Sequence, residues 1–352
     1  MTIIQQKRIS QHLSFVALVE SPEHVCCRYR LKAFQKRFTE AGIGLSYQII
    51  GNTFREFAND LSHLSQLAGI ILQRKLIHPW NSRRLRKKAK LFVLDFDDAI
   101  WLRDSFSPKG LYSRKRRNRF NSLLEKVDGV VVGNSFLAEE VSRNRPALAC
   151  QIIPTCLDTD KYKLASHERT FSDSEAVRLV WVGSSSTIQG LEQQKELLQE
   201  VGKKLPGLVL TTICDRPLEL HHLKTNFVPW SEEIETVELS NSDIGISWIP
   251  YDDWSRGKCG LKILQYMAAG LPVVTNSVGV HREMVIHGQT GFLADTKEEW
   301  LEAIRILARD PELRNQMGRR ARQMVEQKYH IDVGSQLWID FLSRFESKRC
   351  SA

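Results

Sequence analysis

Short apolar runs rich in β-branched residues alternate with longer amphipathic segments along almost the whole chain. Runs of this length without polar alternation are typical of parallel strands that are buried on both faces by helices. The predicted strands span residues 13–19, 45–50, 69–72, 91–94, 129–132 and 151–153, and then 178–182, 208–213, 226–228, 244–248 and 271–275. Helices are predicted between them, among others over 25–41, 112–127, 191–204, 231–239 and 260–269.

This order predicts an α/β protein with two Rossmann-like, doubly wound domains in tandem. The polar stretch 158–175 has little apolar periodicity and marks the predicted boundary. We therefore expect an N-terminal domain over 1–157 and a second domain over 158–330. The strongly helical tail, 331–352, is expected to pack back toward the N-terminal domain.

Composition narrows the class of protein. Of the 352 residues, 42% are hydrophobic and 26% are charged, which is ordinary for a globular chain. No run approaches the roughly 20 apolar residues that span a bilayer, and the first residues show no secretory signal. The seven cysteines form neither a CxxC pair nor a zinc pattern, which predicts reduced thiols in the cytoplasm and no metal site.

Charge is unevenly distributed between the two halves. Residues 1–150 contain 26 Lys and Arg against 13 Asp and Glu, mainly because of the basic runs 83–90 and 114–119. Such runs attract the phosphates of nucleic acids, anionic lipids or phosphorylated glycans, although a solvated helix face explains them equally well. Because no zinc pattern, recognition helix or interleaved aromatic residues accompany them, we expect no nucleic-acid partner and consider an anionic membrane surface instead.

The most informative block spans residues 257–293. Gly257 and Gly260 form a loop that opens a helix near Leu261, and the free amides and dipole of a helix start favour phosphate binding. Lys258 and Lys262 lie on either side of this start, where each could neutralise a diphosphate.

This block resembles the retaining glycosyltransferases of family 4, which have the GT-B fold of two Rossmann-like domains facing across a cleft. The residues in register with the family motif are Gly260, Met267, Ala268, Gly270, Pro272, Val273, Val274, Gly279, Glu283, Gly288 and Gly291. Residues 180–185, 131–137 and 310–329 resemble further family segments, and they occur in the same order.

The resemblance implies a donor site for a nucleotide-diphosphate sugar. Its expected residues are Gly183, Ser184, Ser185, Lys258, Cys259, Gly260, Leu261, Lys262 and Gln265. The family motif has two glutamates separated by seven residues, and this chain has Gly257 and Gln265 there. The resemblance places Gln265 at the nucleotide ribose, while Asp252 or Asp253 could replace the first carboxylate.

The N-terminal domain is expected to hold the acceptor. The predicted strand 91–94 leads into Asp95, Asp97 and Asp98, at the strand edge where doubly wound sheets bind ligands. Asp97 and Asp98 are candidates for a general base or for orienting the acceptor, with a helix N-cap and an ion pair to Arg103 as the plainer alternatives. Together with Lys258 they are the predicted catalytic residues.

By resemblance, the chain is expected to transfer a sugar from a nucleotide-diphosphate sugar to a glycan or lipid-linked acceptor, with retention and without a metal or other cofactor. This activity would serve polysaccharide or glycolipid synthesis, in the cytoplasm or at the inner face of its membrane. Because both motif glutamates are missing, a non-catalytic protein that binds nucleotide sugars or a partner is the alternative.

Overall fold

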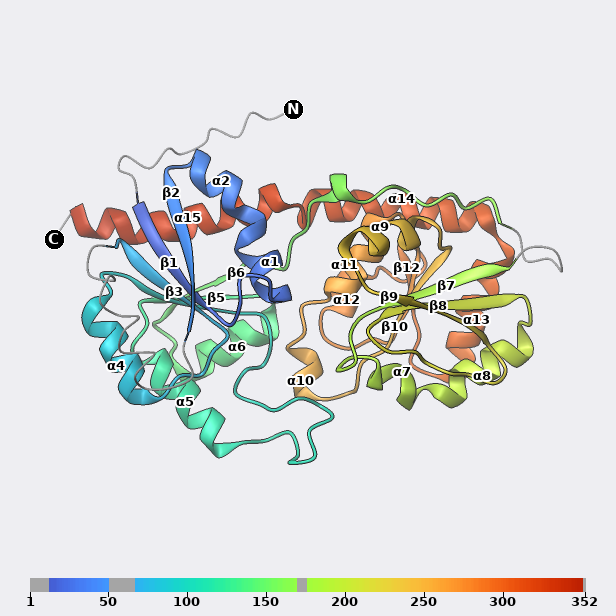
Figure 1. Cartoon of the computed structure of the whole chain (residues 1–352), viewed down its shortest axis with the longest axis horizontal. Coiled ribbons are helices and arrows are strands. Elements are labelled where there is room, and N and C mark those ends of the chain that lie inside the picture. Colours follow the sequence, from blue (N-terminus) through green and yellow to red (C-terminus); the bar gives the residue numbers. More distant parts are fainter. Residues whose placement is uncertain (1–12, 51–66, 170–175, 351–352) are drawn as a thin grey trace. The chain divides into compact units, whose positions relative to one another are not determined.

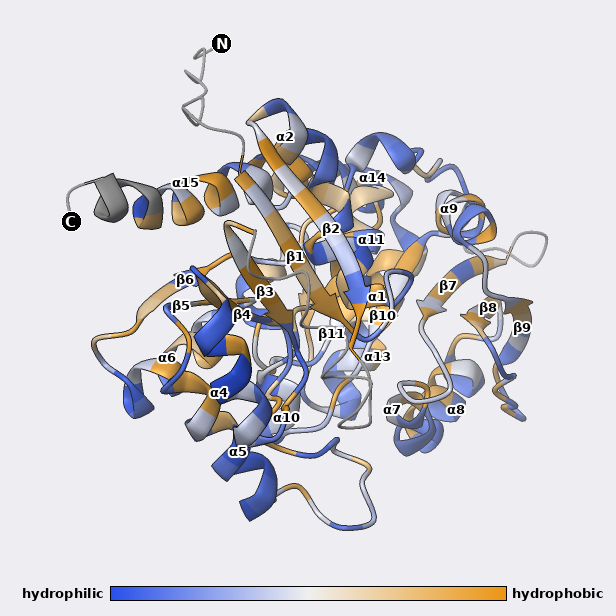
Figure 2. Ribbon diagram, turned by 60° about the vertical axis from the view of Figure 1, so that its left-hand side comes forward, coloured by the Kyte–Doolittle hydropathy of each residue, from blue (hydrophilic) through white to orange (hydrophobic). Residues whose placement is uncertain are grey.

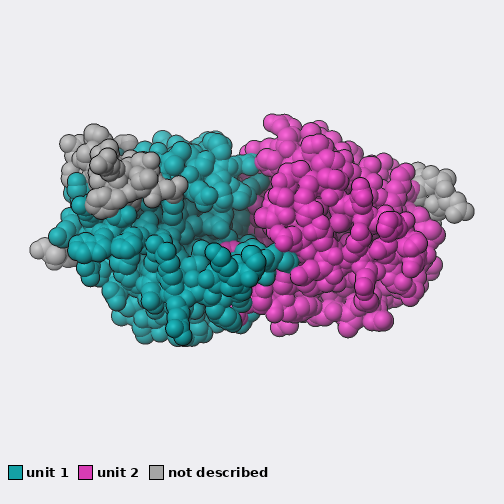
Figure 3. All heavy atoms as spheres, turned by 60° about the horizontal axis from the view of Figure 1, so that its bottom comes forward, with its two compact units in different colours: residues 1–156, 256–259, 331–352 teal, residues 157–255, 260–330 magenta. Residues whose placement is uncertain are grey.

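The computed structural model describes residues 13–50, 67–169 and 176–350 and contains two compact units (Figure 1). Unit 1 comprises Met1–Cys156, Arg256–Cys259 and Ile331–Ala352. Unit 2 comprises Leu157–Ser255 and Gly260–His330 (Figure 3). The short segment Arg256–Cys259 therefore lies within the sequence of unit 2 but belongs to unit 1.

Unit 1 is built on a six-stranded, fully parallel sheet with the order β2-β1-β3-β4-β5-β6. Its strands are β1 (Leu13–Val19), β2 (Ile43–Ile49), β3 (Gly69–Gln73), β4 (Phe92–Phe96), β5 (Gly129–Val132) and β6 (Ala149–Ile152). The strands β3, β4 and β5 are buried along their whole length because helices cover both faces of the sheet.

The helices of unit 1 form two layers. They are α1 (Val25–Arg30), α2 (Gln35–Glu40), α4 (Pro79–Lys88), α5 (Arg114–Leu124), α6 (Ser135–Asn144) and α15 (Ile331–Cys350). α1, α2 and α15 bury their apolar side chains in one core cluster, where Trp338 of α15 makes an edge-to-face contact with Phe38. α4, α5 and α6 lie on the other side of the sheet (Figure 1).

Unit 2 repeats this plan with a second six-stranded parallel sheet, in the order β12-β11-β10-β7-β8-β9. Its strands are β7 (Val177–Val182), β8 (Leu208–Cys214), β9 (Lys224–Pro229), β10 (Ile244–Ser247), β11 (Val273–Thr275) and β12 (Gly291–Leu293). The strand order reverses between β7 and β10, which makes the carboxyl ends of these two strands the switch point where such sheets bind ligands.

Helices also cover both faces of this second sheet. They are α7 (Gln189–Gln193), α8 (Lys195–Lys204), α9 (Glu232–Ser240), α10 (Asp253–Arg256), α11 (Leu261–Ala268), α12 (His281–Met284), α13 (Lys297–Arg309) and α14 (Pro311–Lys328). α8 and α13 pack against β7, β8 and β10 in one core, which includes Trp181 and Trp300. On the other face the ring of Tyr266 fills the space beside Gly245, where a Cβ atom would lie 2.5 Å from the ring.

The predicted α/β class with two doubly wound sheets is confirmed, and each predicted strand lies within two residues of an observed one. One strand, β12 (Gly291–Leu293), is missing from the prediction. The predicted helix 25–41 is wrong as a single element, because Leu31 leaves helical geometry at φ −133° and separates α1 from α2.

Candidate functional site

The turn after β7 carries three of the predicted donor-binding residues, Gly183, Ser184 and Ser185. A Cβ atom on Gly183 would lie 2.4 Å from the ring of Trp181 and 2.5 Å from Oγ1 of Thr187, so only glycine fits there. The amide of Ser184 donates to Thr187 Oγ1 at 3.0 Å, and the amide of Ser185 donates to the Asp215 carboxylate at 2.5 Å. The serines are exposed, which leaves the outer side of this turn open to a ligand.

The helix α11 begins beside this turn. Gly260, its N-cap residue, has a φ of 66° in the left-handed region, and a Cβ atom there would lie 2.6 Å from Sδ of Met284. Among the described residues, no side chain caps the first turn of α11. Unsatisfied amides at a helix start favour an anion, and this is the local feature expected of a diphosphate site.

Two side chains of α11 connect it to the switch point of the sheet. The ammonium of Lys262 lies 4.2 Å from the ring centroid of Trp181 on β7, a cation–π contact that holds the charge at the carboxyl end of that strand. The hydroxyl of Tyr266 donates to Ile246 O on β10 at 3.1 Å and accepts from the amide of Val182 on β7 at 3.0 Å. Gly183, Lys262 and the start of α11 are therefore gathered at one edge of the sheet.

Gln265 is buried on α11, with 4% of its surface exposed. Its amide donates to the carboxylate of Glu235 at 2.6 Å, and Glu235 also accepts from Trp230 Nε1 at 2.7 Å and from the Tyr162 hydroxyl at 3.3 Å. Glu235 itself is 2% exposed. Gln265 thus supplies one of the hydrogen bonds of the buried Glu235 carboxylate, and its contact with a ribose stays a prediction.

The loop after β11 is held by a buried histidine. Nδ1 of His281 lies 2.7 Å from the Thr275 hydroxyl and 3.2 Å from Asn276 O. Burial lowers the pKa of His281 to about 4, so the ring is neutral at physiological pH. The Asn276 side chain in turn bonds both backbone groups of Ile249, which fixes the segment that follows β10.

In unit 1 the predicted acids lie at the carboxyl end of β4. Asp95 forms a fully buried ion pair with Arg30, with a closest distance of 2.6 Å, and accepts from Gln73 at 2.9 Å. Burial opposes the charge on Arg30, but the Asp95 carboxylate outweighs it and raises the pKa of the guanidinium. Arg30 also donates to Ile153 O at 2.9 Å, so this pair connects α1, β4 and the end of β6.

The next two acids, Asp97 and Asp98, share Arg74, which follows β3. Arg74 Nη2 lies 2.5 Å from Asp98, and its Nε lies 3.6 Å from Asp97. Arg74 has a φ of 56°, a strained conformation for a side chain of this size, which directs the guanidinium at both carboxylates. Burial raises the pKa of Asp97, while Arg74 and Arg30 lower it by more, so this carboxylate is ionised and weakly basic.

The segment Arg256–Cys259 joins this cluster. Lys258 Nζ lies 3.1 Å from the Asp98 carboxylate, and that contact outweighs burial and raises the pKa of the ammonium. The thiol of Cys259 donates to Asp97 O at 3.1 Å, and Asn134 Nδ2 donates to Lys258 O at 2.9 Å. A Cβ atom on Gly257 would lie 2.7 Å from the amide of Ala99, so glycine allows the segment to approach the loop after β4 this closely.

The structure therefore separates the predicted site into two groups. Asp97, Asp98, Lys258 and Cys259 lie together in unit 1, whereas Gly183, Ser184, Ser185, Gly260, Leu261 and Lys262 lie at the switch point of unit 2. Sequence reasoning missed Arg74, Asn134, Trp181, Asp215 and Glu235. Arg74 directly follows an apolar strand and Asp215 follows β8, which are signals for a binding edge. Asn134 and Trp181 lie within the family-like segments 131–137 and 180–185, and no sequence signal marks Glu235.

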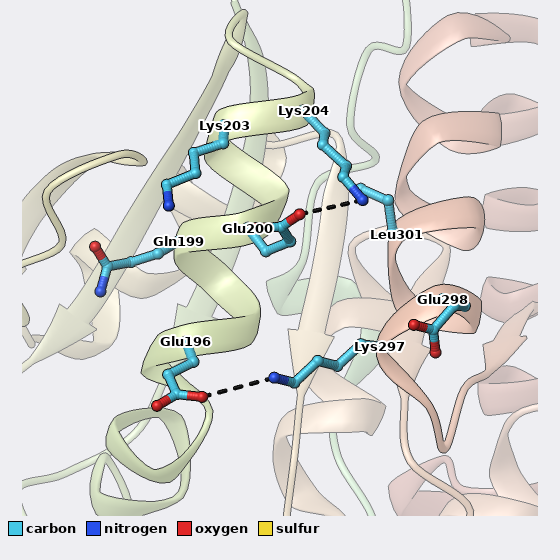
Figure 4. Close-up of a pocket in the computed structure, with 8 residues that line it drawn as sticks. All are labelled: Glu196, Gln199, Glu200, Lys203, Lys204, Lys297, Glu298 and Leu301. Atoms are coloured by element: carbon cyan, nitrogen blue, oxygen red, sulfur yellow. Dashed lines mark ion pairs between the residues drawn. The ribbon is translucent and has the colours of Figure 1, made fainter.

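A separate cavity of about 380 Å³ lies between α8 and α13 (Figure 4). Three lysines and three glutamates line it, and two ion pairs, Lys297–Glu196 and Lys204–Glu200, neutralise much of their charge. The lining has no charge excess that would select an anionic donor. In the described ranges, no group of three or more His, Cys, Asp or Glu side chains is placed to hold a metal ion.

Comparison with known proteins relates part of this chain to a glycosyltransferase family. Residues 221–324 match the model of the family "Glycosyl transferases group 1". Among curated proteins, a trehalose synthase of Pyrococcus horikoshii is 24% identical over 191 residues, which are 50% of this chain and 46% of that protein. An N-acetyl-alpha-D-glucosaminyl L-malate synthase of Bacillus anthracis is 40% identical over 76 residues, which are 21% of this chain and 20% of that protein. The similarity thus spans less than half the length of each.

Solved structures share the fold over nearly the whole chain. A sucrose-phosphate synthase from Thermosynechococcus elongatus has a TM-score of 0.72 at 12% identity, covering 96% of this chain and all of that one. HepE of Anabaena, solved with UDP-glucose, has a TM-score of 0.63 at 14% identity, covering 97% of this chain and all of that one. Two six-stranded parallel sheets with flanking helices agree with this GT-B architecture. The chain therefore has the GT-B fold, and its residues 221–324 resemble the glycosyltransferase group 1 family.

Proposed function

We propose that this protein transfers a sugar from a nucleotide-diphosphate sugar to a glycan or lipid-linked acceptor. The observation that carries the proposal is the edge of unit 2 where the uncapped first turn of α11, Lys262 and the exposed Gly183–Ser185 turn meet at the reversal of strand order. These groups supply amides and a cation for a diphosphate. HepE, which shares the fold, binds UDP-glucose, and UDP is therefore the first nucleotide to test.

In this proposal, unit 2 stabilises the leaving diphosphate. Negative charge grows on the diphosphate as the glycosidic bond breaks, and fixed amides and the Lys262 ammonium favour that charge without reorganising. Lys258 is proposed as a second cation for the donor. We propose transfer with retention and without a metal or other cofactor, as in the enzymes that the donor motif resembles.

Unit 1 is proposed to hold the acceptor. Asp97 has a lowered pKa and Asp98 is engaged by Arg74 and Lys258, so an orienting and electrostatic role suits them better than proton abstraction. A membrane-associated acceptor would place the protein at the inner face of the cytoplasmic membrane. No helix in the described part of the chain has the length and apolar character of a membrane span.

The alternative, a non-catalytic protein that binds nucleotide sugars, is favoured by the absence of both motif glutamates at Gly257 and Gln265. Thermal unfolding with UDP-, GDP-, ADP- and CMP-sugars would identify the nucleotide. Release of the free nucleoside diphosphate, measured with and without a set of glycan and lipid acceptors, would then distinguish the two. Stabilisation by a nucleotide sugar without any release would favour the binding protein, and no stabilisation by any of the four would contradict the donor site.

A further inference from the structure

The solvent face of α4 has an unusual composition. Trp80, Arg83, Arg84, Lys87 and Lys88 follow the i, i+3, i+4, i+7, i+8 spacing of one helix face, and all five are exposed. Ser82 and Leu85 lie on the opposite, buried face. The helix contains no acidic residue, so this exposed stripe, which we call the α4 face, consists of four cations and one indole ring.

The neighbouring helix α5 continues the positive surface. It contains five basic residues and no acidic one, and Arg114 and Lys115 at its start are exposed. Arg119 of α5 donates to Leu76 O just before α4, so the two helices lie side by side, and both are strongly hydrophilic in Figure 2. Arg117 pairs with Glu140 and Arg86 with Asp128 where the helices meet the rest of the unit, whereas the α4 face points to solvent.

Two aromatic side chains lie next to these cations, each just before a basic run and not within it. Trp80 is 66% exposed in the first turn of α4, and Tyr112 is 69% exposed just before α5. They are the most exposed large hydrophobic side chains in the described part of the protein. An exposed indole costs free energy in water, whereas tryptophan and tyrosine are favoured at the level of lipid headgroups. Arg83 lies 5.8 Å from the Trp80 ring centroid, which joins aromatic and basic character in one surface.

We infer that the α4 face, together with the start of α5 and Tyr112, docks on a lipid bilayer with anionic headgroups. The basic side chains supply long-range attraction to lipid phosphates, and Trp80 and Tyr112 enter the interfacial layer. Neither aromatic residue is needed for binding a nucleic-acid backbone. The inference deepens the membrane part of the proposed function by naming the surface, and it does not depend on the donor site.

The test is co-sedimentation of the full chain with vesicles of pure phosphatidylcholine and with vesicles that contain phosphatidylglycerol. We expect association only with the anionic vesicles, and this association should weaken as the salt concentration rises from about 0.05 M to about 0.5 M. Lys87→Glu/Lys88→Glu should weaken it by at least about thirtyfold, because each basic residue near an anionic surface contributes about fivefold. The matched control Arg319→Glu/Arg320→Glu changes the net charge equally on the exposed surface of α14 and should leave association unchanged.

Trp80→Ala separates a bilayer from other polyanions. It should lower vesicle association severalfold and leave the binding of a short DNA duplex unaltered, with Phe227→Ala on β9 as the exposed aromatic control. Equal association with neutral and anionic vesicles, equal effects of the two double variants, or DNA binding without vesicle binding would each overturn the inference. Stabilisation by nucleotide sugars, measured on the same variants, should be unchanged, so that failure of the docking surface and failure of the donor site are distinguishable.

Discussion

Replacing Gln265 by glutamate restores the residue that the family motif has at this position, yet the structure predicts that it destabilises unit 2. The amide of Gln265 donates to Glu235 at 2.6 Å inside the protein, and both side chains are almost completely buried. In Gln265→Glu two carboxyl groups would occupy this contact. One of them must then keep a proton at neutral pH, or the pair must separate.

The magnitude follows from what is lost. Separating the pair forfeits a charge-assisted hydrogen bond of about 1.5–3 kcal/mol, whereas retaining a proton against neutral solvent costs a similar amount, so by either route we expect a loss of about 2–4 kcal/mol. For a unit of this size, that corresponds to a fall in Tm of about 5–15 °C. The pKa of the carboxyl pair is raised in the folded state, so the loss should be small below the pKa of an unfolded glutamate and grow as pH rises.

Thermal unfolding of the variant at pH 5 and pH 8 measures both effects. Gln323→Glu, on the exposed surface of α14, adds the same charge and should leave Tm within about 1–2 °C of the original protein. The double variant Glu235→Gln/Gln265→Glu exchanges the amide and the carboxylate, and it should recover much of the loss because one donor again faces one acceptor. A Gln265→Glu protein with unchanged or higher Tm, tighter nucleotide binding and no benefit from the exchange would refute this reasoning and return Gln265 to the ribose.

Three further predictions test other buried or charged groups. His281→Gln should make the free energy of unfolding less sensitive to acid, because the pKa of His281 falls from 6.5 in the unfolded chain to about 4 in the folded protein, and about 3 kcal/mol of stability is lost as pH drops through that window. Unfolding measured across this pH range checks the prediction, and a variant with the same pH dependence as the original protein would exclude it. Arg30→Met should cost about 3–5 kcal/mol by leaving Asp95 buried without its partner, whereas Arg30→Met/Asp95→Leu should recover most of it; denaturant unfolding of both variants decides. Lys258→Ala should lower nucleotide-diphosphate affinity by about tenfold to a hundredfold while Asp98 keeps Arg74, so calorimetric affinity equal to that of the original protein would remove Lys258 from the donor site.

Much of the fold could be predicted because the signal is repeated and strong. Parallel strands such as β5, Gly129–Val132, are buried on both faces and therefore appear as continuous apolar runs with glycine or asparagine beside them. The glycines of the donor motif could also be predicted from the sequence. Gly260 adopts a left-handed conformation and Gly183 has no room for a Cβ atom, so backbone geometry restricts both positions to one residue type.

The partners of the site residues could not be predicted, because they depend on contacts between distant segments. Gln265 and Glu235 are thirty positions apart on different helices, and neither residue type predicts a contact with the other. Arg74, which contacts Asp97 and Asp98, has a left-handed backbone, an unusual state that no neighbouring residue predicts. Asp215 likewise bonds the amide of Ser185, thirty positions before it, through the pairing of β7 with β8.

The segment Arg256–Cys259 shows why adjacency in a motif is a poor guide to shared chemistry. In the sequence, Lys258 and Lys262 flank one helix start, which predicts that both neutralise one diphosphate. In the structure, Lys258 is fixed by Asp98, and Asn134 holds its backbone, while Lys262 lies over Trp181 on β7 of the other unit. The two lysines thus have different electrostatic partners, and their substitutions should differ in kind. Loss of Lys262 removes a cation from the switch point of unit 2, whereas loss of Lys258 lowers donor affinity and also alters the balance of charge around Asp97 and Asp98, so it should affect acceptor use as well.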